Sequence, residues 1–131
     1  MKFSAIVQNS SGTHKTLLKV GEKEQSIIIP PKPMGGSAIS GGELLLLALA
    51  TCYCNDIYRE AGKLNIRVES VEVEADCDFE AEGKPATNIT YRAWVKTDAS
   101  DETVLELLKH TDAVAEIQNT LRVQTSVILE L

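Results

Sequence analysis

Cysteine is the residue type in this chain most able to do chemistry, and Cys52 has the most distinctive position. The chain has three cysteines, and Cys52 lies near the middle of segment 41–63, whose apolar pattern predicts one long helix. A thiolate there could attack an electrophile or be oxidised, provided that its surroundings lower its pKa. The alternative is that Cys52 is a small apolar core residue, which is the usual role of a free cysteine.

The other two cysteines do not complete a disulfide or a metal site with Cys52. Cys54 is two positions further along, which turns it about 200° around a helix, so a disulfide between the two would require local unwinding. Cys77 falls on the inward face of a predicted strand, where a plain core residue is expected. A structural zinc ion needs four converging ligands, whereas the remaining Cys and His residues are scattered. We predict no metal and no cofactor.

The chain has two histidines, and neither has a spacing that indicates a Cys–His catalytic pair. His14 lies in a predicted turn and His110 late in the second predicted helix, so both are expected at the surface or at its boundary. The sequence contains no Gly-rich phosphate-binding loop and no serine nucleophile elbow.

The pattern of apolar residues predicts the elements that position Cys52. Strands are expected at 2–8, 16–20 and 26–29, followed by the helix 41–63, with Ser40 or Gly41 as N-cap and Gly62 as C-cap. Strands follow at 66–79, with a bulge near Glu69, and at 88–97. A second helix is expected from Ser100 to Leu121, and a last strand at 123–131. The order βββ-α-ββ-α-β predicts a single α+β domain over residues 1–131, with helices on one side of the sheet.

The first helix predicts a partner subunit. In its first half the apolar side chains point in every direction, so the helix must be buried on more than one side; they are Leu44, Leu45, Leu46, Leu47 and Leu49. One small sheet and one further helix would hardly cover such a surface. We therefore expect a homodimer whose long central helix is buried against the sheet. The loop 30–42 is either a plain connector or part of a pocket near the start of this helix.

Charge and hydropathy exclude several classes of partner. The net charge is −6 and no cluster of Lys or Arg occurs, which argues against nucleic acid and anionic membrane surfaces. The longest apolar run, 44–50, is far too short to span a bilayer. The N-terminal segment lacks the apolar core of a secretory signal, so we expect a cytoplasmic protein with reduced thiols.

Segment 43–52, Glu-Leu-Leu-Leu-Leu-Ala-Leu-Ala-Thr-Cys, resembles the central helix of the OsmC/Ohr family. Residues 62–75 also look like the helix-to-strand passage of that family, and the predicted order of elements agrees over the whole chain. The resemblance implies an intertwined homodimer with two sites at the subunit interface. It further implies a reactive cysteine that reduces organic hydroperoxides and becomes a sulfenic acid, which a second cysteine traps. In that family an arginine lowers the thiol pKa and a glutamate at the helix start orients it.

Only part of that site is found in this sequence. Cys52 matches the reactive cysteine, but Ala113 stands where the second cysteine is expected. The arginine position falls near His14 and Lys15. Glu43 comes one residue after the expected glutamate, a rotation of about 100° on a helix. The candidate site residues are therefore Cys52, with Glu43, His14 and Lys15 as possible activators.

These residues leave three functions open. The first is a one-cysteine peroxidase for small apolar hydroperoxides, with an external thiol as reductant and a role in oxidative-stress defence. The second is a non-catalytic homodimer that binds a small apolar molecule in a cavity around Cys52, Tyr53 and loop 30–42. The third is a redox sensor that reports through a sulfenic acid on Cys52.

Overall fold

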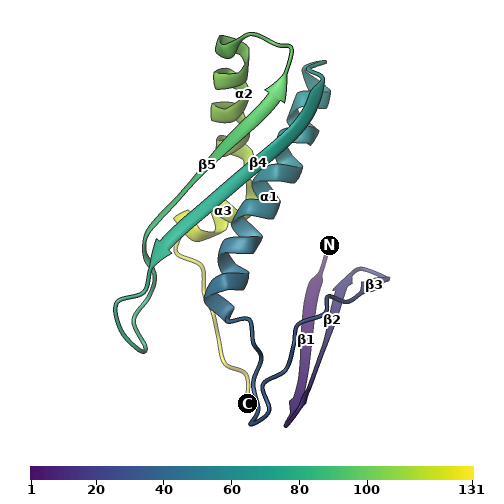
Figure 1. Cartoon of the computed structure of the whole chain (residues 1–131), viewed down its shortest axis with the longest axis vertical. Helices are drawn as coiled ribbons and strands as arrows, with labels where there is room; N and C mark the ends of the chain where they lie inside the picture. Colours follow the sequence, from purple (N-terminus) through teal and green to yellow (C-terminus); the bar gives the residue numbers. More distant parts are fainter. The chain divides into compact units, whose positions relative to one another are not determined.

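The computed structural model describes residues 1–131, which form two compact units, 1–44 and 45–131. The boundary between the units falls in the first turns of helix α1 (Gly41–Lys63). Each unit is described by itself below, and the elements are labelled in Figure 1.

The first unit is an antiparallel sheet in the order β1-β2-β3, formed by β1 (Phe3–Ser10), β2 (Thr13–Val20) and β3 (Lys23–Gln25). Both hairpins turn in two residues, because Ser10 pairs with Thr13 and Val20 pairs with Lys23. Gly12 in the first turn has a φ of 80°, a left-handed conformation that glycine adopts without steric cost. The first two strands therefore lie where they were predicted, but the predicted turn at His14 is wrong: β2 begins at Thr13, because the hairpin turns in only two residues.

The third predicted strand, at 26–29, is wrong: strand pairing ends at Gln25. Beyond Gln25, the side chain of Thr16 takes the place of the hydrogen bonds between strands. Thr16 Oγ1 accepts a hydrogen bond from the Ile27 amide at 3.1 Å and donates to the Ile27 carbonyl at 2.7 Å. Pro30 and Pro31 follow, and neither has an amide hydrogen to donate to a sheet.

Helix α1 begins at Gly41 with Ser40 as its cap, one of the two predicted residues. The Ser40 hydroxyl accepts from the Glu43 amide at 3.2 Å, and the Glu43 carboxylate accepts from the Ser40 amide at 2.6 Å. This reciprocal pair is a capping box. At the other end the predicted C-cap, Gly62, lies inside the helix, and Asn65 is the left-handed residue, with a φ of 56°.

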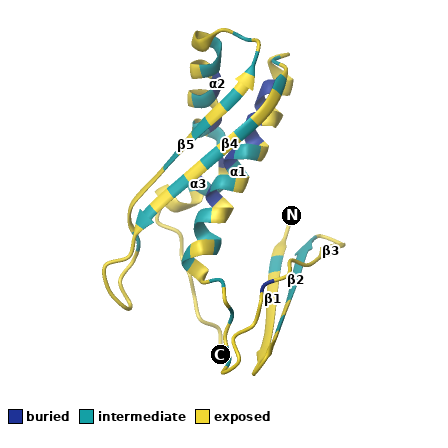
Figure 2. Cartoon of the chain, viewed as in Figure 1, coloured by how far each residue is buried: buried dark blue, intermediate teal, exposed yellow.

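The second unit packs helices against one face of a two-stranded sheet, β4 (Val68–Asp78) and β5 (Thr87–Thr97), as Figure 1 shows. The register of the two strands shifts between Val68 and Ser70, which confirms the predicted bulge. The core lies between sheet and helices, and Figure 2 shows its buried residues along α1 and α2. It consists of Tyr53, Ile57, Ala61, Leu107 and Ala115, with half-buried strand residues packed against them.

Two helices stand where the sequence predicted one. Helix α2 (Asp101–Val114) begins at the predicted cap, because Ser100 Oγ accepts from the Thr103 amide at 3.2 Å. The chain then leaves the helical conformation at Ala115, whose ψ is 114°, and α3 (Glu116–Arg122) follows. Ala115 is fully buried, so the break occurs in the core. Apolar spacing alone did not indicate it, because the helical period continues on both sides.

The last predicted strand, 123–131, is also wrong, since these residues form no strand. An alternating segment becomes a strand only when the edge of another strand satisfies its backbone groups. Here the apolar side chains are left exposed, with Val127 at 95% and Leu129 at 83%.

Among the leucines of the first half of α1, only Leu49 is buried, and Leu47 is 57% exposed.

None of the helices is at once long enough and apolar enough to cross a membrane.

Candidate functional site

Cys52 lies on the face of α1 that meets the start of α3, and two carboxylates contact its sulfur. The thiol donates a hydrogen bond to Asp56 Oδ2 at 3.4 Å and lies 3.9 Å from Glu116 Oε2. Asp56 is one helical turn beyond Cys52, and Glu116 is the first residue of α3. Cys52 is half-buried, whereas Asp56 is only 6% exposed. The two side chains in contact with the sulfur are therefore both acidic.

This setting favours the protonated thiol. Burial raises the pKa of Cys52, and the charges of Asp56 and Glu116 raise it further, against a backbone hydrogen bond from Ile117 that lowers it. Burial also raises the pKa of Asp56. Within this unit, burial and the two carboxylates therefore favour the thiol of Cys52 over its thiolate.

A cation contacts both of the carboxylates that lie at the sulfur. Arg59 NH1 lies 3.1 Å from Asp56 Oδ1 and 2.9 Å from Glu116 Oε1. Arg59 therefore forms ion pairs with both carboxylates that contact Cys52. A backbone hydrogen bond is the largest cause that holds the pKa of Glu116 below its usual range, and the hydrogen bond from Arg59 lowers it further.

Arg59 is itself held by a buried carboxylate, Glu60, which is 2% exposed. Glu60 accepts from Arg59 Nε at 2.7 Å, from His110 Nε2 on α2 at 2.7 Å, and from Lys63 Nζ at 3.0 Å. These contacts, Arg59 first, lower the pKa of Glu60 to about 2. A continuous series of polar contacts thus leads from His110 through Glu60 and Arg59 to the two carboxylates at Cys52.

This network was not predicted from the sequence. Positions 52, 56, 59, 60 and 63 recur at helical spacing and share one face of α1, which is a signal that the sequence does carry. His110 was expected at the surface or its boundary, and its side chain is indeed 51% exposed, although it contacts buried Glu60. Glu116 could not have been found in this way, because it comes from a distant segment and depends on the break at Ala115.

The other predicted site residues belong to the first unit. Glu43 is engaged in the capping box, and its hydrogen bonds with Ser40 lower its pKa. His14 hydrogen-bonds with Asn9 at 2.9 Å within the β1–β2 hairpin, and Lys15 follows it in β2. Their roles as activators of Cys52 stay predictions. All three cysteines are free and half-buried.

The Cys52 cluster contains donor atoms that could also bind a metal. One sulfur and two carboxylate oxygens, from Cys52, Asp56 and Glu116, lie within 4.8 Å of one another. Three protein donors are fewer than the four of a structural zinc site, and in this structure Arg59 pairs with both carboxylates. We describe the cluster as a thiol in contact with two ion-paired carboxylates.

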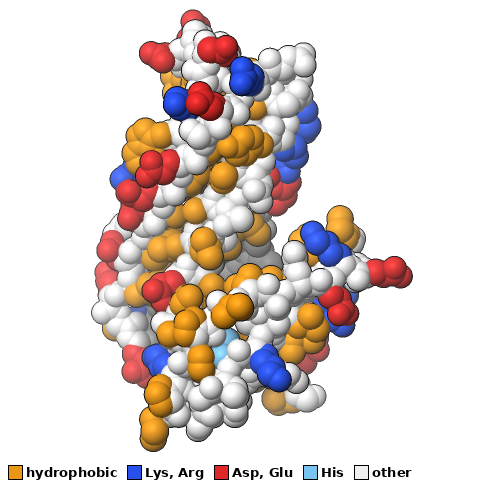
Figure 3. All heavy atoms as spheres, turned by 45° about the vertical axis from the view of Figure 1, so that its right-hand side comes forward, with side chains coloured by type: hydrophobic (Ala, Val, Ile, Leu, Met, Phe, Trp, Pro, Cys, Tyr) orange, Lys and Arg blue, Asp and Glu red, His pale blue; other side chains and the backbone are white.

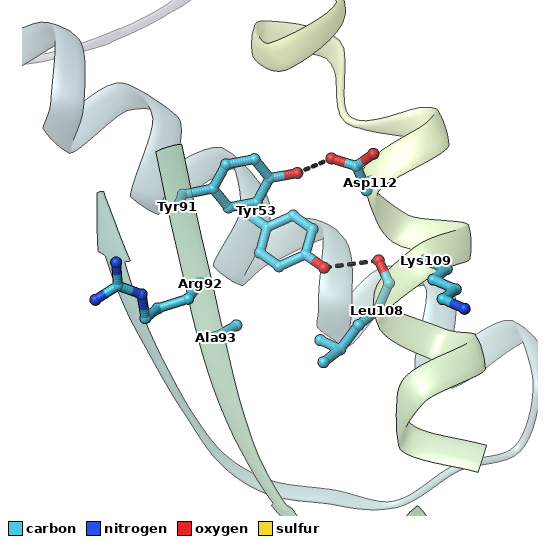
Figure 4. Close-up of a pocket in the computed structure, with 7 residues that line it drawn as sticks. All are labelled: Tyr53, Tyr91, Arg92, Ala93, Leu108, Lys109 and Asp112. Carbon is cyan, nitrogen blue, oxygen red and sulfur yellow. Dashed lines mark hydrogen bonds between the residues drawn. The ribbon is translucent and has the colours of Figure 1, made fainter. Parts of the chain in front are cut away.

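A separate cavity of about 420 Å³ lies between β5 and α2 and contains Tyr53 but not Cys52. The rings of Tyr53 and Tyr91 meet edge to face, with centroids 4.6 Å apart. Figure 4 shows both hydroxyls engaged: Tyr53 donates to the Leu108 carbonyl at 2.7 Å and Tyr91 donates to Asp112. In the same view, Arg92 and Lys109 point away from the rings. The cavity therefore offers mainly aromatic and aliphatic surface.

Comparisons with known proteins identify the fold. An OsmC-like structure from Mycoplasma pneumoniae matches with a TM-score of 0.66 and 13% identity, over 93% of this chain and 88% of that chain. An OsmC-like protein of unknown function from Vibrio cholerae matches with a TM-score of 0.65 and 16% identity, over 92% of this chain and 93% of that chain. An organic hydroperoxide resistance protein from Elizabethkingia anophelis matches with a TM-score of 0.63 and 14% identity, over 93% of this chain and 89% of that chain. No curated protein sequence matches the chain.

A sequence model of one family spans most of the chain. The model described as OsmC-like protein matches residues 34–130, which include α1, the thiol cluster and the β4–β5 sheet. This match agrees with the resemblance of segment 43–52 and with the mixed α+β fold of the structural neighbours. The chain belongs to the OsmC-like protein family.

Proposed function

We propose that this protein reduces organic hydroperoxides through Cys52, with Asp56 as the acceptor of the thiol proton. The observation that carries the proposal is the hydrogen bond from Cys52 Sγ to Asp56 Oδ2, at 3.4 Å. A carboxylate in that position can take the proton as the sulfur reacts, so a stable thiolate is not needed beforehand. Family membership supports the choice of substrate, since one structural neighbour is the organic hydroperoxide resistance protein of Elizabethkingia anophelis.

The first step forms an S–O bond and breaks the O–O bond. The Cys52 sulfur attacks the terminal oxygen of the hydroperoxide ROOH while its proton passes to Asp56. The alkoxide RO⁻ leaves and takes that proton to become the alcohol ROH, and Cys52 becomes a sulfenic acid. The raised pKa of Asp56, caused mainly by burial, makes this carboxylate a stronger proton acceptor.

The second step needs a thiol from outside the chain, because Ala113 stands where the family resemblance leads us to expect a second cysteine. One external thiol condenses with the sulfenic acid and releases water. A second thiol then releases Cys52 and leaves as a disulfide. The three free cysteines fit a compartment in which such thiols are kept reduced.

The test is consumption of cumene hydroperoxide in the presence of dithiothreitol. We expect turnover by the wild-type protein, its loss in Cys52→Ser, and its retention in Cys54→Ser. Asp56→Asn should reduce the rate by about 10²-fold, the lower end of general acid–base contributions. Absence of turnover by the wild-type protein, or turnover that survives in Cys52→Ser, would contradict the proposal.

Binding of a small apolar molecule without chemistry is the second candidate function. The aromatic cavity of about 420 Å³ next to Tyr53 favours it, as does the raised pKa of Cys52. A titration with 1-naphthol, followed by tyrosine fluorescence, should show saturable binding that Tyr91→Ala weakens. Binding without hydroperoxide turnover would favour this function over the first.

We also propose that the protein is a homodimer. Figure 3 shows hydrophobic side chains on the molecular surface, and the exposed ones include Leu47, Tyr58 and Ile128. A second copy that covers such surfaces would remove apolar area from water. Light scattering after size exclusion should give twice the chain mass of 14.3 kDa. A monomer at micromolar concentration would contradict the proposal.

A further inference from the structure

We propose that Glu60 and His110 are positioning residues that hold Arg59 against Asp56 and Glu116, and that this arrangement sets how readily Cys52 loses its proton. The inference draws its biological meaning from the proposed role of Cys52, but its test does not require hydroperoxide turnover.

First, Arg59 contacts two carboxylates, those of Glu60 and Glu116, through different nitrogen atoms. Its Nε donates to Glu60 Oε2 at 2.7 Å, while NH1 donates to Glu116 Oε1 at 2.9 Å. The guanidinium is planar and its donors are fixed relative to one another. A carboxylate that fixes Nε therefore also fixes where NH1 points. Glu60 is thus able to aim the cation at the carboxylates beside Cys52.

The second step is the anchoring of Glu60. Its other oxygen, Oε1, is 2.7 Å from His110 Nε2, so Arg59 and His110 occupy different oxygens of one carboxylate. Glu60 is 2% exposed and comes from α1, whereas His110 comes from α2. The contact therefore fixes the orientation of the carboxylate between two packed helices. Lys63 joins only on Oε2, from a side chain that is 64% exposed.

The third step is the charge balance at Cys52. Asp56 and Glu116 both contact the sulfur, and two carboxylates oppose a third negative charge there. Arg59 is the cation that contacts both carboxylates. The charged or titratable groups of this cluster are Asp56, Arg59, Glu60 and Lys63 from α1, His110 from α2 and Glu116 from α3.

The fourth step is what happens when the anchor is lost. The Arg59 side chain is 39% exposed, so water is available to it as an alternative environment. A long side chain gains rotamer freedom when it is released. Without Glu60 the guanidinium would move toward solvent, and the carboxylates at Cys52 would lose part of their counter-charge. A thiolate at Cys52 would then be harder to form.

The experiment measures the pH dependence of iodoacetamide alkylation of Cys52 in a full-length Cys54→Ser background. Peptide mapping reads Cys77 separately. Glu60→Gln should move the alkylation profile to higher pH by about one unit, which at pH 8 is about a tenfold slower rate. Arg59→Gln should produce a shift at least as large. The double variant should shift no further than Arg59→Gln alone, because both changes act through the same guanidinium. His110→Gln should produce a smaller shift in the same direction.

Two matched variants serve as controls. Lys63→Gln removes a cation that contacts Glu60 at 3.0 Å but does not touch Arg59. Arg92→Gln removes an arginine of β5 that pairs with Glu74 and Asp76 instead. Both should leave the Cys52 profile within about 0.3 pH units of the background, since surface charges act weakly at a distance. A shift in either control as large as that of Glu60→Gln would overturn the proposal.

The direction of the shift is decisive. Loss of the Glu60 charge alone, with Arg59 remaining in place, would make Cys52 more acidic and move the profile to lower pH. That result, or an unchanged profile, would overturn the proposal. If Glu60→Gln does not fold, as judged by near-UV circular dichroism, then His110→Gln and Arg59→Gln decide the matter by the same criterion. Hydroperoxide consumption is measured separately, so its absence together with the predicted shifts would contradict the proposed function alone.

Discussion

The two halves of α1 reverse the usual relation between polarity and burial. The first half, 41–51, is almost entirely apolar, yet Leu47 is 57% exposed. The second half, 52–63, carries most of the charged residues, yet Glu60 is 2% exposed. The difference shows that burial within one chain depends on what packs against a segment, because α2, α3 and the β4–β5 sheet contact the second half.

The two halves also carry different free-energy costs. In the first half of α1 the exposed leucines are a cost in water that a second chain could remove. In the second half, buried charges would be a cost in the interior, and the pairing of Asp56, Arg59 and Glu60 removes most of it.

Shortening one apolar side chain in each half of α1 should give the largest difference in stability. Ile57→Ala should lower the free energy of unfolding by about 2–5 kcal/mol, because Ile57 is 0% exposed in the core. Leu47→Ala should cost less than about 1 kcal/mol in the monomer. Urea unfolding at low protein concentration measures both. Comparable losses in dilute monomer would show that the first half is buried within one chain.

Acid should weaken the second half of α1 through Glu60. Its pKa is lowered from 4.5 to about 2, mainly by Arg59, so the ionised group stabilises the fold above pH 4.5. That contribution is lost as the pH falls from 4.5 through about 2. We expect wild type to be more stable than Glu60→Gln at pH 7, and the difference to shrink toward zero near pH 2. Urea midpoints at pH 7, 4 and 2.5 measure it, and a difference that is independent of pH would contradict the assignment.

A smaller effect should appear at the start of α1. Ser40→Ala removes the hydroxyl that accepts from the Glu43 amide at 3.2 Å, and should cost about 1 kcal/mol. Ser40→Thr keeps an accepting hydroxyl and serves as the control. Thermal unfolding of the two variants measures the difference. Equal melting temperatures would show that the cap contributes little to the stability of α1.

Much of the fold could be predicted from local pattern. The span of α1, the cap at Ser40, the bulge before Ser70 and the cap at Ser100 all follow from residues close together in the sequence. The errors fall where a distant partner decides. The segment 123–131 alternates like a strand, but finds no strand edge within this chain. The helix break at Ala115 lies in the core and interrupts a continuous helical period.

The candidate site, too, could be predicted only in part. Cys52 was chosen from the sequence because of its place in an apolar helix and its resemblance to a family segment, and the family match includes it. Its surroundings were not predicted: the charged face of α1 was overlooked, and Glu116 comes from another element. The resemblance led us to expect activators at Glu43, His14 and Lys15, whereas the contacts of the thiol in the second unit are Asp56 and Glu116.

The sequence by itself determined the helix, the position of the thiol along it and the family to which the chain belongs. Helical period, capping residues and the spacing of a short motif are local properties, so they predict structure wherever no distant contact overrides them. Tertiary structure alone decided that Glu116 reaches the sulfur of Cys52 and that His110 of α2 contacts the buried Glu60 that holds Arg59. The acidity of a thiol depends on charges within a few ångströms, and Glu116, which is 64 residues from Cys52 along the chain, is brought to the sulfur only by packing.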